Sequence, residues 1–395
     1  MSVPEAQILP LECALLVSVR ARSENIKQDV KGQRTFNALL FIVGYKVVMV
    51  TLLCVGVSLL LALQVGAVTN CHPGCRCEVE TFGLFDSFSL TRVDCSGVGP
   101  WSAPIPIPLD TSHLDLSSNA IRALSGAMLS GPGYTTLVSL DLSGNLIAGV
   151  TADAFSRLRY LESLDLSHNA LEELTDGCFS GLPLSEVDLG GNRIGELRLS
   201  VFSARGQGRP LSVDASHNLL TAVTRGLPGN PPNIQSLTLA GNRLEAVPKL
   251  QGLGLRYLNL DANPIAAIGQ EAFAGLTDLV HLSLSGLQEL TTVQPGAFHD
   301  LQSLQVLDMS NNPRLTLLDP EVFRGLLSLQ ELNLSHSGMA SLPDDILNHL
   351  PSLRSVSLGA DVHCWKAQKQ GQFHRPLGQT KSDHVLTCEV TGVSL

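Results

Sequence analysis

The chain has 395 residues, of which only 16% are charged and 5% aromatic, so its apolar content comes mostly from Leu, Val and Ala. This is enough apolar material to bury a large core, which excludes intrinsic disorder for most of the chain. The 36 acidic residues outnumber the 26 basic ones, and the net charge of −10 disfavours nucleic acid and anionic membranes as main partners. The length alone suggests two or three globular domains, but that expectation fails for a repetitive sequence such as this one.

An uncharged run precedes the acidic part of the chain. It covers residues 47–67 and is just long enough to span a bilayer as a helix. Met49 could instead start a signal peptide, residues 49–67, that is cleaved after Ala67. We favour this signal peptide over a signal anchor, and we interpret residues 1–48 as an extension upstream of the real start or removed from the mature protein. Because the basic residues lie before the run, both alternatives predict that everything after residue 67 lies outside the cytosol.

The cysteines fit an exported protein with disulfide-bonded caps. Cys13 and Cys54 lie in or before the targeting segment, which leaves seven, and six of these cluster at the two ends: Cys71, Cys75, Cys77, Cys95, Cys364 and Cys388. We expect Cys71 to pair with Cys77 and Cys75 with Cys95, although spacing alone leaves three connectivities. We expect Cys364 and Cys388 to close the second end.

The seventh cysteine, Cys178, stands where the equivalent segments have a small apolar residue such as Ala154 or Ala297. A free cysteine behaves as such a residue in a core. We therefore predict an inert buried thiol rather than an intermolecular disulfide or a reactive site.

The pattern Leu-x-x-Leu-x-Leu-x-x-Asn recurs eleven times between residues 110 and 361. Its copies are about 24 residues apart, inside the range of leucine-rich repeats. The second Leu position of each copy is occupied by Leu114, Leu140, Leu164, Val187, Val213, Leu237, Leu258, Leu282, Leu307, Leu332 and Val356. The repeats lie between a predicted N-terminal cap at residues 71–99 and a C-terminal cap and tail at residues 362–395.

This period predicts an α/β repeat solenoid, a horseshoe with a parallel β-sheet on its concave face. In Leu-x-Leu the two leucines point to one face of a short strand, and only stacking of repeats can bury that face. Bulky phenylalanines such as Phe155 and Phe298 in the return arms spread the outer side. We expect the asparagine of each repeat to bond turn backbone, and two repeats carry Leu287 and Ser337 instead.

The spacing C-x3-C-x-C-x17-C, the eleven repeats and the two-cysteine end together resemble the small leucine-rich proteoglycans. The long last gap departs from the best-known members. The stretches from Cys77 to Gly97, from Gly131 to Leu137 and from Ser156 to Asn169 are similar to a divergent member almost residue for residue. The resemblance covers Cys71 to about Cys388.

The resemblance implies a secreted extracellular regulator of morphogen and growth-factor signalling. Proteins of this divergent type bind bone morphogenetic proteins and chordin and dampen that pathway, and they are linked to Wnt signalling through Frizzled receptors. These are the partners that we expect, without nucleic acid. The alternative function is a membrane-anchored adhesion molecule or co-receptor, held by residues 47–67.

The middle outward position of successive strands is acidic in the N-terminal half of the repeats, where five aspartates follow one another: Asp115, Asp141, Asp165, Asp188 and Asp214. Such a ladder could dock a cationic partner, but Leu-Asp-Leu-Ser is also common in these repeats, so solvated aspartates are an equal alternative. Tyr257, His281 and Glu331 are larger groups in the C-terminal half and candidate anchor residues.

Three further segments carry weaker expectations. Phe82, Phe85 and Phe88 are predicted to cover the core of the first repeat rather than to bind a partner. Asn333 opens a glycosylation pattern, Asn-Leu-Ser, although within a strand. A basic segment after Cys364 could contact heparan sulfate weakly, although a solvated loop is favoured; its cations are Lys366, Lys369, Arg375 and Lys381.

The chain carries no motif that points to catalysis. The repeat itself explains every approach of Ser, His and Asp in the sequence, such as Asp165 near Ser167 and His168. A strained nucleophile turn, a phosphate-binding glycine loop and a metal-ligand spacing are all missing from the sequence. We therefore predict a binding protein that is not an enzyme, with no metal and no cofactor.

Overall fold

The computed structural model describes residues 71–82, 88–99, 101, 104–203, 208–226, 232–339, 346–359, 362–366 and 386–390. The chain divides into two units, Met1–Ala67 and Val68–Leu395, and the described residues all belong to the second. The predicted extension and the signal peptide or anchor therefore lie outside the described residues. Among the residues that are described, no helix has the length and apolar character needed to cross a membrane.

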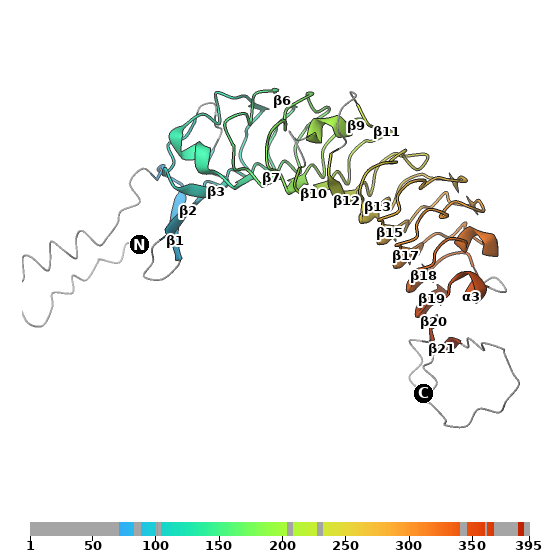
Figure 1. Cartoon of the computed structure of the whole chain (residues 1–395). Helices are drawn as coiled ribbons and strands as arrows, with labels where there is room; N and C mark the ends of the chain where they lie inside the picture. The colour runs from blue at the N-terminus through green and yellow to red at the C-terminus, as the bar shows by residue number, and fades with distance from the viewer. Residues whose placement is uncertain are drawn as a thin grey trace, which may run out of the picture. The chain divides into compact units, whose positions relative to one another are not determined.

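One sheet of fifteen strands runs through the described part of the second unit. Eleven parallel strands form its body, and Figure 1 shows them side by side along the inner edge of the curved row of repeats. They are β3 (Thr111–Asp115), β5 (Ser139–Asp141), β7 (Ser163–Asp165), β8 (Glu186–Asp188), β10 (Leu211–Asp214), β12 (Ile234–Thr238), β13 (Tyr257–Asn259), β15 (His281–Ser283), β17 (Val306–Asp308), β18 (Glu331–Ser335) and β19 (Ser355–Gly359). Each of the eleven predicted repeats supplies one strand.

The register of the sheet aligns the repeats position by position. Leu114 lies opposite Leu140, which lies opposite Leu164, and the same file continues through to Val356. These side chains are almost completely buried, while the residues on either side of them in each strand face outward. The sheet therefore has one face in the core and one face, the concave face, open to solvent.

The outer side of the unit is made of turns and short elements. It holds three two-stranded ribbons, β4 (Ala123–Leu124) with β6 (Gly149–Val150), β9 (Glu196–Arg198) with β11 (Ala222–Thr224), and β14 (Ala267–Ile268) with β16 (Thr292–Val293). Its described helical elements are η1 (Pro132–Thr136), η2 (Leu199–Phe202), η3 (Pro320–Phe323) and α3 (Ile346–His349). The helical part of the predicted α/β repeat is thus small, because a repeat of about 24 residues leaves arms too short for long helices.

Stacked phenylalanines fill these outer arms, as the sequence predicts. Phe155 stacks on Phe179 with ring centroids 5.8 Å apart, and Phe179 stacks on Phe202 at 5.6 Å. Phe273 and Phe298 repeat the arrangement at 5.6 Å. The stacks bury bulk on the outer side while the strands keep their narrow spacing of about 4.8 Å on the inner side, which makes the row of repeats curve.

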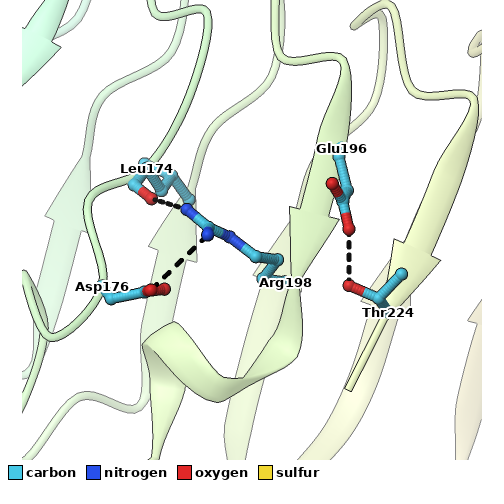
Figure 2. Close-up of polar contacts among 5 residues, drawn as sticks. All are labelled: Leu174, Asp176, Glu196, Arg198 and Thr224. Carbon is cyan, nitrogen blue, oxygen red and sulfur yellow. Dashed lines mark hydrogen bonds and ion pairs between the residues drawn. The ribbon is translucent and has the colours of Figure 1, made fainter. Parts of the chain in front are cut away.

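Polar contacts tie neighbouring arms together at the surface. Arg198 donates a hydrogen bond to the carbonyl oxygen of Leu174 at 3.0 Å and pairs with Asp176 at 3.4 Å. In the adjacent arm the Thr224 hydroxyl donates to Glu196 at 2.8 Å, and Figure 2 shows all three contacts. The four polar side chains are partly or fully exposed, so the ion pair contributes little stability.

The asparagine of each repeat holds two turns at once. The Asn192 amide donates to the carbonyl oxygens of Leu166 and Leu189, both at 2.9 Å, and its oxygen accepts from the backbone N–H of Leu171 at 3.1 Å. Two repeats have another residue at this position. Leu287 is fully buried in the core, and the Ser337 hydroxyl still donates to the Leu334 carbonyl oxygen at 2.6 Å. The predicted structural role of the asparagines is confirmed.

The residue before this position has a left-handed backbone in the first ten repeats, and glycine alternates with other residues through the first eight copies. The file reads Ser118, Gly144, His168, Gly191, His217, Gly241, Ala262, Gly286, Asn311 and His336. A Cβ on Gly241 would lie 2.5 Å from the His217 ring, and one on Gly191 would lie 2.7 Å from the His168 ring. The side chain of the preceding repeat therefore favours glycine at Gly191 and Gly241, where the left-handed φ also suits glycine best.

Both ends of the sheet carry cap strands. At the first end, β1 (Arg76–Phe82) and β2 (Phe88–Asp94) form an antiparallel pair, with the Cys71–Cys77 and Cys75–Cys95 disulfides as predicted. At the other end, Cys364 in β20 (Val362–Lys366) is disulfide-bonded and lies opposite Cys388 in β21 (Leu386–Val390).

Cys178 is a free, buried thiol, and burial raises its pKa to about 12, so the predicted inert thiol fits its surroundings. Phe85, Lys369, Arg375 and Lys381 lie outside the described residues. For Phe82, Phe88 and Lys366 the structure describes only the backbone.

Candidate functional site

The register brings the five predicted aspartates into one file on the concave face, at the last position of β3, β5, β7, β8 and β10. We call this file the acidic ladder. Asp94 in β2 lies opposite Asp115 and extends the ladder by one more carboxylate. Asp94 was not among the predicted residues because it stands in the cap, outside the repeat pattern. Its position directly before Cys95, where the repeats have a buried apolar residue, was the available signal.

Each ladder carboxylate also closes the turn that follows its strand. Its Oδ1 atom accepts a hydrogen bond from the backbone N–H two residues later, at 2.8 to 2.9 Å in all six cases. The pairs are Asp94 with Ser96, Asp115 with Ser117, Asp141 with Ser143, Asp165 with Ser167, Asp188 with Gly190 and Asp214 with Ser216. One oxygen of each aspartate is thus structural.

Neutral side chains make the same bond farther along the sheet. Asn259 accepts from the backbone N–H of Asp261 at 2.8 Å, and Asn333 accepts from that of Ser335 at 3.1 Å. Ser283 stands at this position in β15 and does not close its own turn. Instead, the Asp261 carboxylate of the preceding repeat accepts hydrogen bonds from the Ser283 hydroxyl and from the turn N–H of Ser285. The turn therefore needs an acceptor of the right length but not a negative charge.

The negative charges of the ladder act on one another. The pKa of Asp188 is raised, first by burial and then by the charges of Asp165 and Asp214, while its bond to Gly190 and the nearby His168 oppose the shift. At the end of the ladder the balance is reversed, because hydrogen bonds from Ser96 lower the pKa of Asp94. Asp188, which has a ladder carboxylate on each side, is therefore a place where an added cation would relieve repulsion.

The predicted anchor residues lie on the same face but form one pair rather than a trio. Tyr257 and His281 are register neighbours whose rings stack with centroids 4.9 Å apart and an interplanar angle of 25°. Glu331 is separated from His281 by the strand that carries Val306. Both rings are partly exposed and Glu331 is exposed.

Asn333 also lies on the concave face, in β18. Its amide nitrogen donates to Asp308 at 3.2 Å, and its oxygen accepts from the N–H and the hydroxyl of Ser335. A glycan on this nitrogen would have to share it with Asp308 and would project over the sheet. Occupancy of Asn333 therefore stays a prediction.

The described residues offer no candidate metal site. No group of three or more His, Cys, Asp or Glu residues that could hold a metal is found among them. The hollow at the start of the concave face, about 320 Å³, is lined by charged residues of both signs, including Arg76, Arg92 and Asp94. Arg92 pairs there with Glu80 at 2.7 Å.

The comparisons with known proteins agree with this architecture. The family model described as "Leucine rich repeat" matches residues 135–194 and 253–313, and a second model of the same description matches residues 303–326. The chain is 61% identical to Tsukushi of Danio rerio over 88% of its own length and 100% of that protein. The chain belongs to the Tsukushi family.

Two other Tsukushi proteins give the same result. The Homo sapiens protein is 58% identical over 82% of this chain and 92% of its own length, and the Mus musculus protein is 52% identical over 81% and 92%. The resemblance to a divergent small leucine-rich proteoglycan is thereby confirmed and narrowed to Tsukushi. The names of these relatives state no ligand, so the use of the concave face has to be argued from its own geometry.

Proposed function

We propose that the chain is a secreted extracellular binding protein that modulates morphogen and growth-factor signalling and is not an enzyme. Its concave face is the proposed binding surface, and the acidic ladder docks a basic patch on a growth factor or its carrier. One observation supports this proposal most. The turns do not need the negative charge of the ladder aspartates, because Asn259 and Asn333 close equivalent turns with a neutral amide. Bone morphogenetic proteins, chordin and Frizzled-type ectodomains are the partners expected from the family resemblance.

The floor beside the ladder favours contact with a folded protein. The outward positions that flank it are occupied by small residues such as Ser139, Ser163 and Ser143. A smooth surface of this kind allows a partner to approach the carboxylates closely, and a protein interface of about 1,600 Å² is ordinary. Weak contact of heparan sulfate with the basic segment after Cys364 stays a prediction.

The test replaces Asp141, Asp165 and Asp188 together by Asn, which keeps the turn-closing oxygen and removes the charge. Binding of a bone morphogenetic protein, of chordin and of a Frizzled ectodomain is measured at 50 and 300 mM NaCl. For at least one partner we expect about tenfold weaker binding at low salt and a smaller salt dependence. A control with the same charge change replaces the exposed residues Glu172, Glu173 and Glu245 by Gln and should bind as the wild type does. Equal affinity of the Asn variant would remove the ladder from the mechanism.

Residues 47–67 favour one competing function, a membrane-anchored adhesion molecule or co-receptor. Expression from Met1 with a C-terminal tag separates the two. We expect the tagged protein in the culture medium. Tag that stays in the membrane fraction after a carbonate wash would contradict secretion and support the anchored alternative.

A further inference from the structure

The outward-facing row on the other side of the buried leucines changes abruptly in the middle of the concave face. From β5 to β19 this row reads Ser139, Ser163, Glu186, Ser212, Ser236, Tyr257, His281, Val306, Glu331 and Ser355. Two serines therefore precede Tyr257 directly. The step from short to long side chains creates a wall at Tyr257.

The geometry of the ring pair fixes which faces of the two rings are covered. The centroids of Tyr257 and His281 are 4.9 Å apart, close to the strand spacing of about 4.8 Å, and their planes are nearly parallel. The two rings are therefore stacked, and each covers the face of the other that lies between them. The outer face of Tyr257 points toward β12, and the outer face of His281 points toward β17.

The two outer faces have different neighbours. Val306 stands next to His281, whereas Ser236 stands next to Tyr257, and a hydroxymethyl group is too short to cover a phenol ring. Ser212 is equally short, so the next long side chain in the row is Glu186, three strands or about 14 Å from Tyr257. We call this stretch of short side chains between Glu186 and Tyr257 the slot, and the ring of Tyr257 bounds it on one side.

The slot favours a cation. Asp214 lies on the same face as Ser212, two residues along β10, and Glu186 stands at the far end. The outward-facing positions of β8, β10, β12 and β13 contain no Lys or Arg. The negative face of an aromatic ring attracts a cation as well, and a planar guanidinium can stack on the ring while it bonds a carboxylate.

We infer that the slot beside Tyr257 receives an arginine side chain of the bound partner, stacked on the outer face of the phenol ring. This inference rests on the proposed binding function and adds the anchor to it. The acidic ladder supplies long-range attraction, which salt screens, and the Tyr257 ring supplies a short-range contact, which salt affects less.

The test uses the full-length chain, purified, and two octapeptides, octa-arginine and octa-citrulline, whose side chains have similar shape but different charge. Tyr257→Ser installs the residue found at Ser139, Ser163, Ser212 and Ser236, so the fold should tolerate it. Tyr257→Phe keeps the ring, and Tyr160→Ser removes a tyrosine that is 62% exposed and lies outside the sheet. Fluorescence anisotropy gives the affinities at 150 and 500 mM NaCl.

We expect Tyr257→Ser to weaken octa-arginine binding about three- to tenfold at both salt concentrations, whereas Tyr257→Phe and Tyr160→Ser stay within twofold of the wild type. Octa-citrulline should bind more weakly and should not distinguish the variants. The inference is wrong if Tyr257→Ser binds octa-arginine as the wild type does, if octa-citrulline binds equally well, or if Tyr257→Phe loses as much as Tyr257→Ser.

Binding of a bone morphogenetic protein in parallel separates this inference from the proposed function. If the growth factor binds and the ladder variant weakens it while Tyr257→Ser does not, only the arginine slot is wrong. If none of the three expected partners binds the wild type, the proposed function fails whatever the peptides do.

Discussion

The two halves of the concave sheet close the same turns with different side chains. In the first half, from β3 to β10, the ladder position holds an aspartate in every strand, and the carboxylate accepts the turn N–H at 2.8 Å. In the second half, from β12 to β19, the position changes from strand to strand: Asp308 makes the aspartate bond once more, and an amide at Asn259 makes the same bond at the same distance. The backbone geometry is alike although the charge is not.

This difference separates what the fold requires from what the surface presents. The turn requires one oxygen acceptor, which an amide supplies as well as a carboxylate. Burial and then the charges of Asp165 and Asp214 raise the pKa of Asp188, so the unbroken run of aspartates has a cost that Asn259 avoids. The turn does not need this run, and the proposed partner is the reason that we offer for it.

The largest expected effect tests what the fold requires. Asn192→Ala removes two buried donors and one buried acceptor that join neighbouring repeats, and it leaves two carbonyl oxygens and one N–H without these partners. We expect the free energy of unfolding in urea to fall by about 2–4 kcal/mol. Asp188→Asn, four residues away, keeps its turn bond and should show no such loss. An equal loss in both variants would contradict the separation of structure from charge.

The next effect concerns the row of residues before the turn asparagines, whose left-handed backbone continues through both halves. Gly241→Ala places a Cβ on a residue with φ of +64°, 2.5 Å from the His217 ring. We expect a loss of about 1–3 kcal/mol, since the left-handed backbone alone costs about 1–2 kcal/mol. Gly254→Ala is the control, because nothing lies within 4 Å of its Cβ and its φ is not left-handed. Thermal unfolding of the two variants would show a drop for the first only.

The sequence predicts periodic features of this molecule well and contacts between repeats less well. Each copy of the pattern has an apolar residue equivalent to Leu164. This residue fixes where the strand lies, how it pairs with its neighbours and which of its faces is buried. The Tyr257–His281 stack could not be read from the sequence, since it depends on the orientation of two rings in different repeats. The sequence also did not predict that Asp261, rather than Ser283, accepts the turn N–H of Ser285, because this bond joins two repeats as well.

A smaller effect compares the pH response of Asp188, which has a ladder carboxylate on each side, with that of Asp94 at the end of the ladder. The pKa of Asp188 is raised above 3.8, so its contribution to stability is fully present below pH 3.8 and is lost as the pH rises through the folded-state value. Asp188→Asn should therefore gain stability over the wild type as the pH rises.

The pKa of Asp94 is lowered, so its contribution is present above pH 3.8 and is lost as the pH falls through the folded-state value. Asp94→Asn should be less stable than the wild type at pH 7, and urea titrations from pH 3 to 8 that gave one sign for both would contradict the assigned causes.

The smallest effect is expected on the outer side, where charge serves neither a turn nor the proposed partner. Arg198→Gln removes the partly exposed pair with Asp176 and the hydrogen bond to the Leu174 carbonyl oxygen, both drawn in Figure 2, whereas the Thr224–Glu196 bond beside them stays. We expect the free energy of unfolding to fall by about 1 kcal/mol or less, because an exposed ion pair gains little in water and one hydrogen bond contributes about 1 kcal/mol. Growth-factor affinity should not change, although the variant raises the net negative charge by one as the ladder variants lower it. If affinity followed the net charge wherever the charge was changed, the concave arrangement of the aspartates would be irrelevant. Arg198→Gln is therefore a strict control for the ladder, because it changes the net charge away from the concave face.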